Sequence, residues 1–303
     1  MDNNELVICQ GLTKNYGKKT ALNNLNLTLG RGQFIGLLGP NGSGKTTTIK
    51  LLNGLLQPSE GEVLLDGKSI WDAKGKCSRE TRFRVGLVFQ YPEYQLFEET
   101  IAKDIAYGPT NMKLPQTEID ERVRESMAAV GLAPELADQS PFALSGGQKR
   151  RVAIAGVLAM DPEVLILDEP TAGLDPEERL RFYNLLSELA VERIILLSTH
   201  IASDIEATCS KAAVLSSGTV VFEGQIEKLL QLGNGKVYTT TILQNELNQF
   251  KQKYRVISIY QNGINVSCRF LSNAAPKKEW VSCQPTIEDS YMYLLSSFKQ
   301  EVE

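Results

Sequence analysis

The chain has 303 residues, of which 42% are hydrophobic and 22% charged, enough to bury the core of one large domain and a smaller second one. Its formal net charge of −4 argues against broad electrostatic binding to nucleic acid or anionic lipid. No run approaches the ~18 apolar residues that cross a bilayer, and the first residues lack the basic and apolar segments of a secretory signal, so any work at a membrane is expected to go through partner chains.

Strand signals dominate the first part of the chain. Residues 6–9 predict a short strand, and residues 24–29 alternate polar and apolar side chains, which is typical of a strand with one buried face. Residues 34–38 form a short apolar run that favours a buried strand. A glycine-rich loop follows, then a helix is predicted over residues 45–55 and a strand entering a hairpin over residues 62–65.

The middle of the chain alternates between helical and strand patterns. Residues 116–160 lack strand signals and are predicted to be mainly helical. Apolar strands are predicted at residues 164–167 and 194–197, with a helix over 177–189 between them. Buried strands separated by helices favour a parallel sheet covered on both faces. We therefore predict one α/β domain over residues 1–232.

The composition changes near residues 233–235, which are predicted to be a linker. An Asn-Gly turn at residues 262–263 predicts a β-hairpin. We interpret residues 233–303 as a small α+β appendix. Its expected elements are strands over residues 237–243, 255–260 and 264–271 and a helix from Thr286, with Asp289 completing a capping box.

The numbers and positions of the cysteine and histidine residues limit the kinds of metal site that the chain can form. The only histidine is His200, which excludes an all-histidine metal site within one chain. The cysteines are interpreted as free thiols of a reducing cytosol, and no stable metal cluster is expected. They are scattered and include no C-x-x-C pair: Cys9, Cys77, Cys209, Cys268 and Cys283.

Residues 39–46 fit G-x-x-x-x-G-K-[ST] in full and stand between a predicted strand and a predicted helix. Glycines let backbone N–H groups converge on an anion, and a helix N-terminus adds partial positive charge there. Lys45 can reach the β- and γ-phosphates of a nucleotide, and the Thr46 hydroxyl can bind Mg²⁺. The alternative, a chance glycine-rich turn, is disfavoured by the flanking strand and helix.

Two acids, Asp168 and Glu169, end the apolar run at 164–167. The carboxyl end of a parallel strand lies at the crevice where such sheets bind ligands. Asp168 is predicted to bind Mg²⁺, and Glu169 to polarise the attacking water as a general base. An apolar run followed by Asp-Glu is by itself more often a strand entering a solvated loop, so the prediction depends on the phosphate loop upstream.

A second anion-binding nest is predicted at residues 144–148, which read L-S-G-G-Q. Ser145 can cap the helix that follows, while the two glycines leave N–H groups free. Since one nucleotide needs only one such loop, the second suits a nucleotide held by a neighbouring chain. Arg150 and Arg151, just beyond it, are interpreted as surface or helix-packing residues.

On these motifs the sequence resembles the ABC ATPase family, whose signature sequence is L-S-G-G-Q, over residues 5–232. The resemblance implies a P-loop NTPase fold with a helical subdomain at about residues 91–160. It also implies that Tyr16 stacks on adenine, that Gln90 senses Mg²⁺ and faces a transmembrane partner, and that His200 contacts the γ-phosphate. Taken alone, Tyr16 would be a surface aromatic, Gln90 uninformative and a lone histidine structural.

The resemblance implies ATP and Mg²⁺ as ligands. Catalysis is expected from Lys45, Gln90, Glu169 and His200, and Mg²⁺ binding from Thr46, Gln90 and Asp168. Within the chain ATP is expected to contact Tyr16, Gly39, Asn41, Gly42, Ser43, Gly44, Lys45, Thr46 and Thr47. A partner ATPase subunit, in a homodimer or a heterodimer, would receive Ser145, Gly147, Gln148 and Asp175 over its own ATP.

Two resemblances point to different transport machines. Residues 85–109 are similar to ATPases of energy-coupling factor importers, which take up vitamins and transition-metal ions. Residues 46–54, 177–206 and 285–291 are similar to exporter ATPases of the bacitracin or lantibiotic type. The direction of transport therefore stays open at this point.

We predict an ATP-hydrolysing transporter subunit at the cytoplasmic face of the cell membrane, attached peripherally to integral membrane subunits. One alternative is an ABC ATPase of DNA repair or translation. Such proteins carry long coiled-coil insertions, two ATPase domains or zinc-binding cysteines, and none of these is visible in the sequence. Another is a regulatory module that does not hydrolyse ATP, which the presence of Glu169 and His200 disfavours. No nucleic acid partner is expected.

Overall fold

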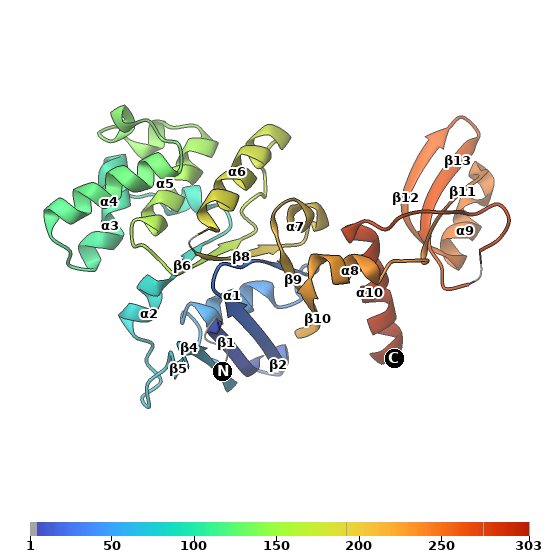
Figure 1. Ribbon diagram of the computed structural model, residues 1–303, viewed down its shortest axis with the longest axis horizontal. Helices are drawn as coiled ribbons and strands as arrows, with labels where there is room; N and C mark the ends of the chain where they lie inside the picture. The colour runs from blue at the N-terminus through green and yellow to red at the C-terminus, as the bar shows by residue number, and fades with distance from the viewer. Residues whose placement is uncertain (1–4, 192, 275, 303) are drawn as a thin grey trace.

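The computed structural model describes residues 5–191, 193–274 and 276–302. Three regions lie in a row along the longest axis of the molecule (Figure 1): a helical region at one end, two sheets in the middle and a third sheet at the other end. None of the helices in these ranges is long and apolar enough to cross a membrane.

A six-stranded sheet with the order β10-β9-β3-β8-β7-β6 forms the centre of the molecule. All of its strands except β10 run parallel to their neighbours, as predicted from the apolar runs. Every residue of β3, β7 and β8 is buried, because both faces of the sheet are covered. The strands are β3 (Phe34–Leu38), β6 (Val85–Val88), β7 (Val164–Asp168), β8 (Ile194–Thr199), β9 (Lys211–Ser216) and β10 (Thr219–Gln225).

A second, antiparallel sheet has the order β2-β1-β4-β5. Its first two strands are much longer than the predicted segments 6–9 and 24–29. The prediction was too short because register shifts, such as the one between Cys9 and Leu12, interrupt the polar–apolar alternation. The strands are β1 (Glu5–Tyr16), β2 (Lys19–Gly30), β4 (Glu60–Leu65) and β5 (Lys68–Ser69).

Helix α1 (Lys45–Leu52) shares one hydrophobic cluster with the antiparallel sheet and one face of the central sheet. The predicted helix extended to residue 55. It ends earlier because Gly54 takes a left-handed conformation at φ 71° and the N–H groups of Leu55 and Leu56 turn back to the Lys50 carbonyl.

The other face of the central sheet packs against helices of the predicted helical subdomain, in a second hydrophobic cluster. Two of these helices lie within residues 116–160, which were predicted to be mainly helical, and short 3₁₀ turns join the helices. The helices of the region are α3 (Ile101–Asn111), α4 (Gln116–Ala129) and α5 (Gly146–Leu158), with 3₁₀ turns η1 (Pro92–Gln95), η2 (Pro134–Leu136) and η3 (Pro141–Ala143). The remaining helices of this half are α2 (Arg79–Arg84), α6 (Pro176–Leu189), α7 (Ala202–Thr208) and α8 (Ile226–Gln231).

The third sheet, β12-β13-β11-β14, is antiparallel and surrounds a small aromatic core of Tyr238, Phe250, Tyr254, Phe270 and Trp280. The predicted hairpin at the Asn-Gly turn is β12 and β13. The elements are β11 (Val237–Leu243), β12 (Arg255–Asn262), β13 (Asn265–Leu271) and β14 (Val281–Ser282), with η4 (Gln244–Glu246), α9 (Leu247–Lys253) and α10 (Ile287–Val302).

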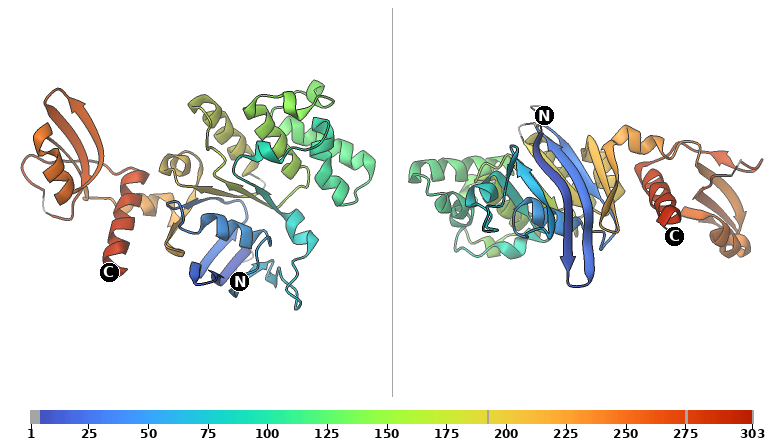
Figure 2. Two further views of the ribbon diagram at one scale, coloured as in Figure 1. Left: turned by 180° about the vertical axis from the view of Figure 1, so that it is seen from behind. Right: turned by 90° about the horizontal axis from the view of Figure 1, so that it is seen from below.

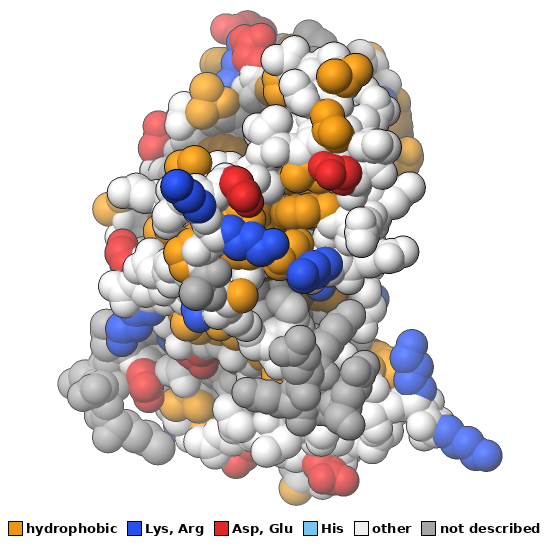
Figure 3. Space-filling model, turned by 90° about the vertical axis from the view of Figure 1, so that its right-hand side faces the viewer, with side chains coloured by type: hydrophobic (Ala, Val, Ile, Leu, Met, Phe, Trp, Pro, Cys, Tyr) orange, Lys and Arg blue, Asp and Glu red, His pale blue; other side chains and the backbone are white. Residues whose placement is uncertain are grey.

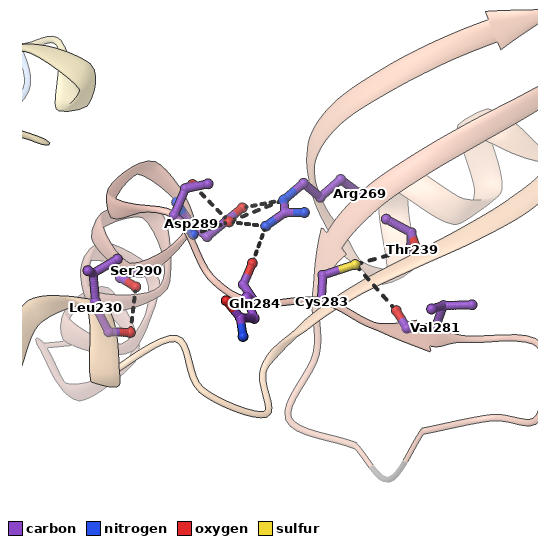
Figure 4. A network of polar contacts seen from close by, with 9 residues as sticks. Leu230, Thr239, Arg269, Val281, Cys283, Gln284, Asp289 and Ser290 are labelled. Atoms are coloured by element: carbon purple, nitrogen blue, oxygen red, sulfur yellow. Dashed lines mark hydrogen bonds and ion pairs between the residues drawn. The ribbon is translucent and has the colours of Figure 1, made fainter. Parts of the chain in front are cut away.

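The last helix, α10, does not belong to this aromatic core. Its residues Ile287, Tyr291 and Leu295 share a hydrophobic cluster with α7 and α8, and Figure 2 shows α10 between the central sheet and the third sheet. The proposed appendix over residues 233–303 therefore does not pack as one unit, although its boundary stays a prediction. Asp289 of α10 nevertheless binds Arg269 of β13 (Figure 4).

The end of the molecule formed by the third sheet exposes hydrophobic side chains among lysine and arginine side chains (Figure 3). The exposed large hydrophobic residues of this region are Leu243, Ile259, Tyr260, Ile264 and Val281. These side chains give the third sheet an apolar surface beside its buried aromatic core.

Candidate functional site

A cleft of about 750 Å³ lies at the carboxyl end of the central strands, where β3 leads into α1. This is the edge at which parallel sheets bind ligands. Of the residues predicted for the site from within the chain, those that line the cleft are Tyr16, Asn41, Gly42, Gly44, Lys45, Thr46, Thr47, Gln90 and Glu169.

The phosphate loop has the backbone that an anion cradle needs. Gly44 has φ 109°, and a Cβ at Gly39 would lie 2.5 Å from the Ser43 hydroxyl and 2.6 Å from a backbone carbonyl. Gly44 is the N-cap of α1 and offers no side chain to the first-turn N–H groups. The buried Ser43 hydroxyl has no partner within the described chain. Free donors around a glycine turn at a helix N-terminus fit a phosphate group.

Lys45 is folded back over this loop. Its side chain is buried, and its ammonium group donates to the carbonyls of Gly39 at 2.8 Å and Pro40 at 3.3 Å. The same group lies 3.5 Å from Glu169 Oε1. Lys45 therefore brings a positive charge to the floor of the cleft, beside the second predicted acid.

Asp168, at the end of β7, is buried and accepts hydrogen bonds from the Thr46 and Ser198 hydroxyls, each at 3.1 Å. Burial raises the pKa of the Asp168 carboxyl above its usual range, and the two hydroxyl donors oppose that shift. A hydroxyl and a carboxylate meeting beside the phosphate loop are the oxygen ligands that Mg²⁺ prefers. The residues present therefore fit a divalent cation at this place.

Glu169 is the point at which the predicted catalytic side chains meet. Gln90 Nε2 lies 3.4 Å and His200 Nδ1 3.2 Å from Glu169 Oε2, while Lys45 approaches the other carboxylate oxygen. Its backbone has φ 46°, which is uncommon for a residue with a side chain. The Glu169 N–H donates to the Ser198 carbonyl at 2.9 Å and fixes this conformation. Backbone strain of this kind is typical of functional positions.

The signature segment lies apart from this cleft. Ser145 caps α5, and Gln148 completes a capping box: the Ser145 hydroxyl accepts from the Gln148 N–H at 3.3 Å, and the Gln148 side chain accepts from the Ser145 N–H at 3.1 Å. Asp175 caps α6 through the Glu178 N–H at 2.8 Å. None of Ser145, Gly147, Gln148 and Asp175 lines the cleft of its own chain.

Arg150 was interpreted as a surface or helix-packing residue, but the structure gives it a more specific place. Its side chain is only 5% exposed and donates to the carbonyls of Pro170 at 2.8 Å and Ala172 at 3.2 Å. It also lies 3.4 Å from Glu93. Arg150 thus joins the signature helix to the loop after Glu169, a contact that no spacing in the sequence indicates.

The segment after Gln90 borders a second hollow, of about 480 Å³, between α2, α3 and α5. Two aromatic side chains of its lining are exposed, Phe97 by 56% and Tyr107 by 52%, and Tyr94, just before the lining residue Gln95, is 84% exposed. Phe97 and Tyr107 stack edge to face at 4.9 Å. Ordinary core packing does not explain aromatic rings with this much exposure.

The ABC transporter family model matches residues 22–172. The energy-coupling factor transporter ATP-binding protein EcfA2 of Clostridium perfringens is 52% identical over 218 residues, which are 71% of this chain and 76% of that protein. Among solved structures, cbiO1 of Clostridium perfringens, part of the ABC transporter complex cbiONQ, has a TM-score of 0.68 and 34% identity over 82% of this chain and all of that one. A post-hydrolysis ATP-binding cassette bound to ADP and Pi has a TM-score of 0.61 and 28% identity over 73% of this chain and 98% of that one.

These similarities favour one of the two resemblances over the other. They support the similarity of residues 85–109 to energy-coupling factor ATPases and a role in transport. They do not support the exporter alternative that residues 46–54, 177–206 and 285–291 indicated.

Proposed function

Because the chain belongs to the ABC transporter ATPases, we propose that its ATP hydrolysis drives an energy-coupling factor transporter. The observation that carries the proposal is the hollow in the segment after Gln90, whose lining includes the exposed aromatic rings of Phe97 and Tyr107 and suits a partner. The names of the similar proteins agree with it. The cargo that the resemblance of residues 85–109 favours is a vitamin or a transition-metal ion.

Within the chain, the roles follow from the geometry around Glu169. Lys45 and the phosphate loop hold the triphosphate, and Tyr16, half exposed at the cleft, offers a flat ring for adenine. Glu169 orients and polarises the attacking water, and His200, 3.2 Å away, stands where it can contact the γ-phosphate. We thus assign hydrolysis to Glu169 and to the side chains that approach it in the structure.

Thr46, Asp168 and Gln90 would hold Mg²⁺ in this arrangement. The ion neutralises charge on the β- and γ-phosphates when bound. The hydroxyl of Thr46 and the carboxylate of Asp168 already lie 3.1 Å apart, so little rearrangement is needed to present two oxygens to a cation.

A second ATPase subunit completes the site in our proposal. Ser145, Gly147, Gln148 and Asp175 lie outside the cleft of their own chain, and the Ser145 cap leaves the start of α5 facing outward with its N–H groups. Two chains packed head to tail would place this segment over the partner's ATP. A homodimer would then hold two sites, and a heterodimer with a related chain is equally compatible with the residues.

The membrane partner is assigned to the hollow lined by Phe97, Tyr107 and Met160. An amphipathic helix lies in such a groove through apolar anchors. Arg79, Arg82 and Asp104 supply charges around its edge. We place the chain peripherally, at the cytoplasmic face of the membrane, held there by this contact.

The proposal is tested by affinity purification of the full chain from membranes. The expected result is recovery of an integral membrane subunit together with an ATPase subunit. Tyr94→Glu should lose the membrane subunit, because a charge would replace an exposed aromatic beside the hollow. The matched control is Tyr260→Glu, at a residue with comparable exposure, 73% against 84%, in the third sheet.

Other outcomes would contradict specific parts of the proposal. Recovery with DNA or ribosomes would overturn the transport role. Recovery of a polytopic exporter subunit would overturn the assignment to an energy-coupling factor transporter. Equal loss of the membrane subunit in both tyrosine variants would move the docking surface away from the hollow.

A further inference from the structure

Asp204 of α7 is a buried carboxylate at which several elements meet. Its side chain has no exposed surface. One oxygen, Oδ2, accepts hydrogen bonds from the hydroxyls of Thr171 and Thr199, each at 2.8 Å. The other, Oδ1, accepts from the Tyr183 hydroxyl and lies 3.9 Å from Arg179. One oxygen therefore serves the two loops beside the cleft, and the other serves helix α6.

Thr199 holds the backbone immediately before His200. Its hydroxyl donates to Asp204 and accepts from the Ile201 N–H at 3.0 Å. Thr199 therefore holds the backbone both before and after His200. Its carbonyl accepts from the Gly39 N–H of the phosphate loop at 3.3 Å. The His200 side chain is itself 43% exposed. Because little packing surrounds the ring, its place near Glu169 depends on this backbone.

Thr171 holds the other loop. It lies two residues after Glu169, and its hydroxyl is tied to the same Asp204 oxygen. The Ala172 N–H donates a hydrogen bond to the Glu169 carbonyl at 3.1 Å, and the Leu174 N–H donates one to the Thr171 carbonyl at 3.2 Å. These two bonds close the turn after Glu169. The position of this turn, which leads to Asp175 and its predicted contact with a partner subunit, thus depends on the same carboxylate.

We propose that Asp204 is a positioning residue for ATP hydrolysis, whose Oδ2 fixes the loop of His200 and the loop after Glu169 relative to each other. The inference rests on the proposed catalytic roles of His200 and Glu169. Asp204 is buried outside the lining of the cleft and acts through Thr199 and Thr171. It explains why an acid is placed in the interior of the protein beside two threonines.

A carboxylate suits this role better than an apolar group would. An ionised group is costly to bury unless hydrogen bonds satisfy it, so its donors are held at fixed places. Thr171 and Thr199 are each only 1% exposed, and without Asp204 their hydroxyls would lose the acceptor they now share. A displacement of the His200 loop of about 1 Å would be enough to lower the rate of hydrolysis by roughly 100-fold.

The inference is tested with two matched variants of the full-length chain, each of which removes one hydrogen-bond donor from a different oxygen of Asp204. Thr199→Val removes a hydroxyl from Oδ2, and Tyr183→Phe removes one from Oδ1. We expect Thr199→Val to lower kcat by about 10- to 100-fold with the KM for ATP nearly unchanged, since misplacement affects the reaction rather than binding. Thr199→Ser, which keeps the hydroxyl, should restore kcat, and Tyr183→Phe should leave both constants near those of the wild type.

Melting temperatures of all variants separate positioning from stability. If Asp204 were only structural, Tyr183→Phe and Thr199→Val would shift the melting temperature and leave kcat of the folded protein unchanged; equal kcat in both variants would overturn the inference. His200→Ala is the reference. Normal turnover in His200→Ala would overturn the catalytic role of His200, and the inference with it. Lost turnover in His200→Ala with normal turnover in Thr199→Val would overturn the inference alone.

Discussion

The ATPase half and the C-terminal third sheet are built on different principles. In the first, Lys45, Gln90 and His200 approach one side chain, Glu169, from separate elements. In the second, the central feature is a cluster of aromatic rings around Phe270. We therefore expect the third sheet to tolerate substitution without a change in the hydrolysis reaction.

The largest expected effect tests the catalytic half. Glu169→Gln should lower kcat for ATP hydrolysis by about 10²- to 10⁴-fold, because an amide cannot polarise the attacking water as a base. ATP binding and ATP-dependent dimerisation should persist, since the phosphate loop is unchanged. Steady-state phosphate release and size-exclusion chromatography with ATP measure the two properties. Glu188→Gln, at an exposed acid of α6, is the control, and normal turnover in Glu169→Gln would remove the base assignment.

The sequence predicts the catalytic half well because its chemistry lies in short motifs. A loop at residues 39–46 and a strand ending in Asp168 and Glu169 carry their own geometry, since a strand followed by a turn and a helix can be arranged in few ways. The predicted cap at Ser145 and the predicted capping box at Thr286 are likewise local, and both are present.

What the sequence does not predict depends on contacts between distant residues. Arg150 finds its acceptors about 20 residues away, at Pro170 and Ala172, and Asp204 finds Thr171 33 residues away. Neither residue belongs to a spacing pattern. The packing of α10 against α7 and α8, instead of the third sheet, was missed for the same reason: an apolar helix face does not specify its partner.

The second prediction tests whether the two halves are independent. Phe270 is fully buried and contacts the rings of Phe250 and Trp280 at 4.9 Å each. Phe270→Ala should destabilise the third sheet by about 3–5 kcal/mol. Trp71→Phe leaves Trp280 as the sole tryptophan, so its fluorescence reports this region. Unfolding of the third sheet with unchanged kcat is expected.

Tyr260→Ala, at an exposed position of the same sheet, is the control for Phe270→Ala and should leave Trp280 fluorescence unchanged. A loss of ATP hydrolysis in Phe270→Ala, measured with the rest of the chain still folded, would show that the third sheet supports the catalytic half through α10. That result would break the division between the two regions.

The third prediction concerns the polar link between the third sheet and α10. Asp289 is fully buried, and its carboxylate binds the Arg269 guanidinium at 2.6 Å and the Thr286 N–H at 2.8 Å (Figure 4). Burial alone would raise its pKa, but the hydrogen bonds from Arg269 and Thr286 outweigh burial and lower it. An acid with a lowered folded-state pKa stabilises the fold above its unfolded pKa, near 4, and that stability is lost as pH falls through the folded value.

Asp289→Asn should therefore lower the unfolding temperature of the third sheet at pH 7. The expected loss in the free energy of unfolding is roughly 3 kcal/mol, since a buried ion pair loses one of its partners. The difference from the wild type should begin to shrink below about pH 4, where Asp289 of the unfolded chain becomes protonated, and should be lost as the pH falls through its lowered folded-state pKa. Trp280 fluorescence during heating, from pH 7 to pH 3, measures it in the Trp71→Phe background. Glu288→Gln, at the exposed neighbouring acid, should follow the wild-type curve. A constant difference at every pH would mean that Asp289 acts by packing, and α10 would then join the two halves through its apolar face alone.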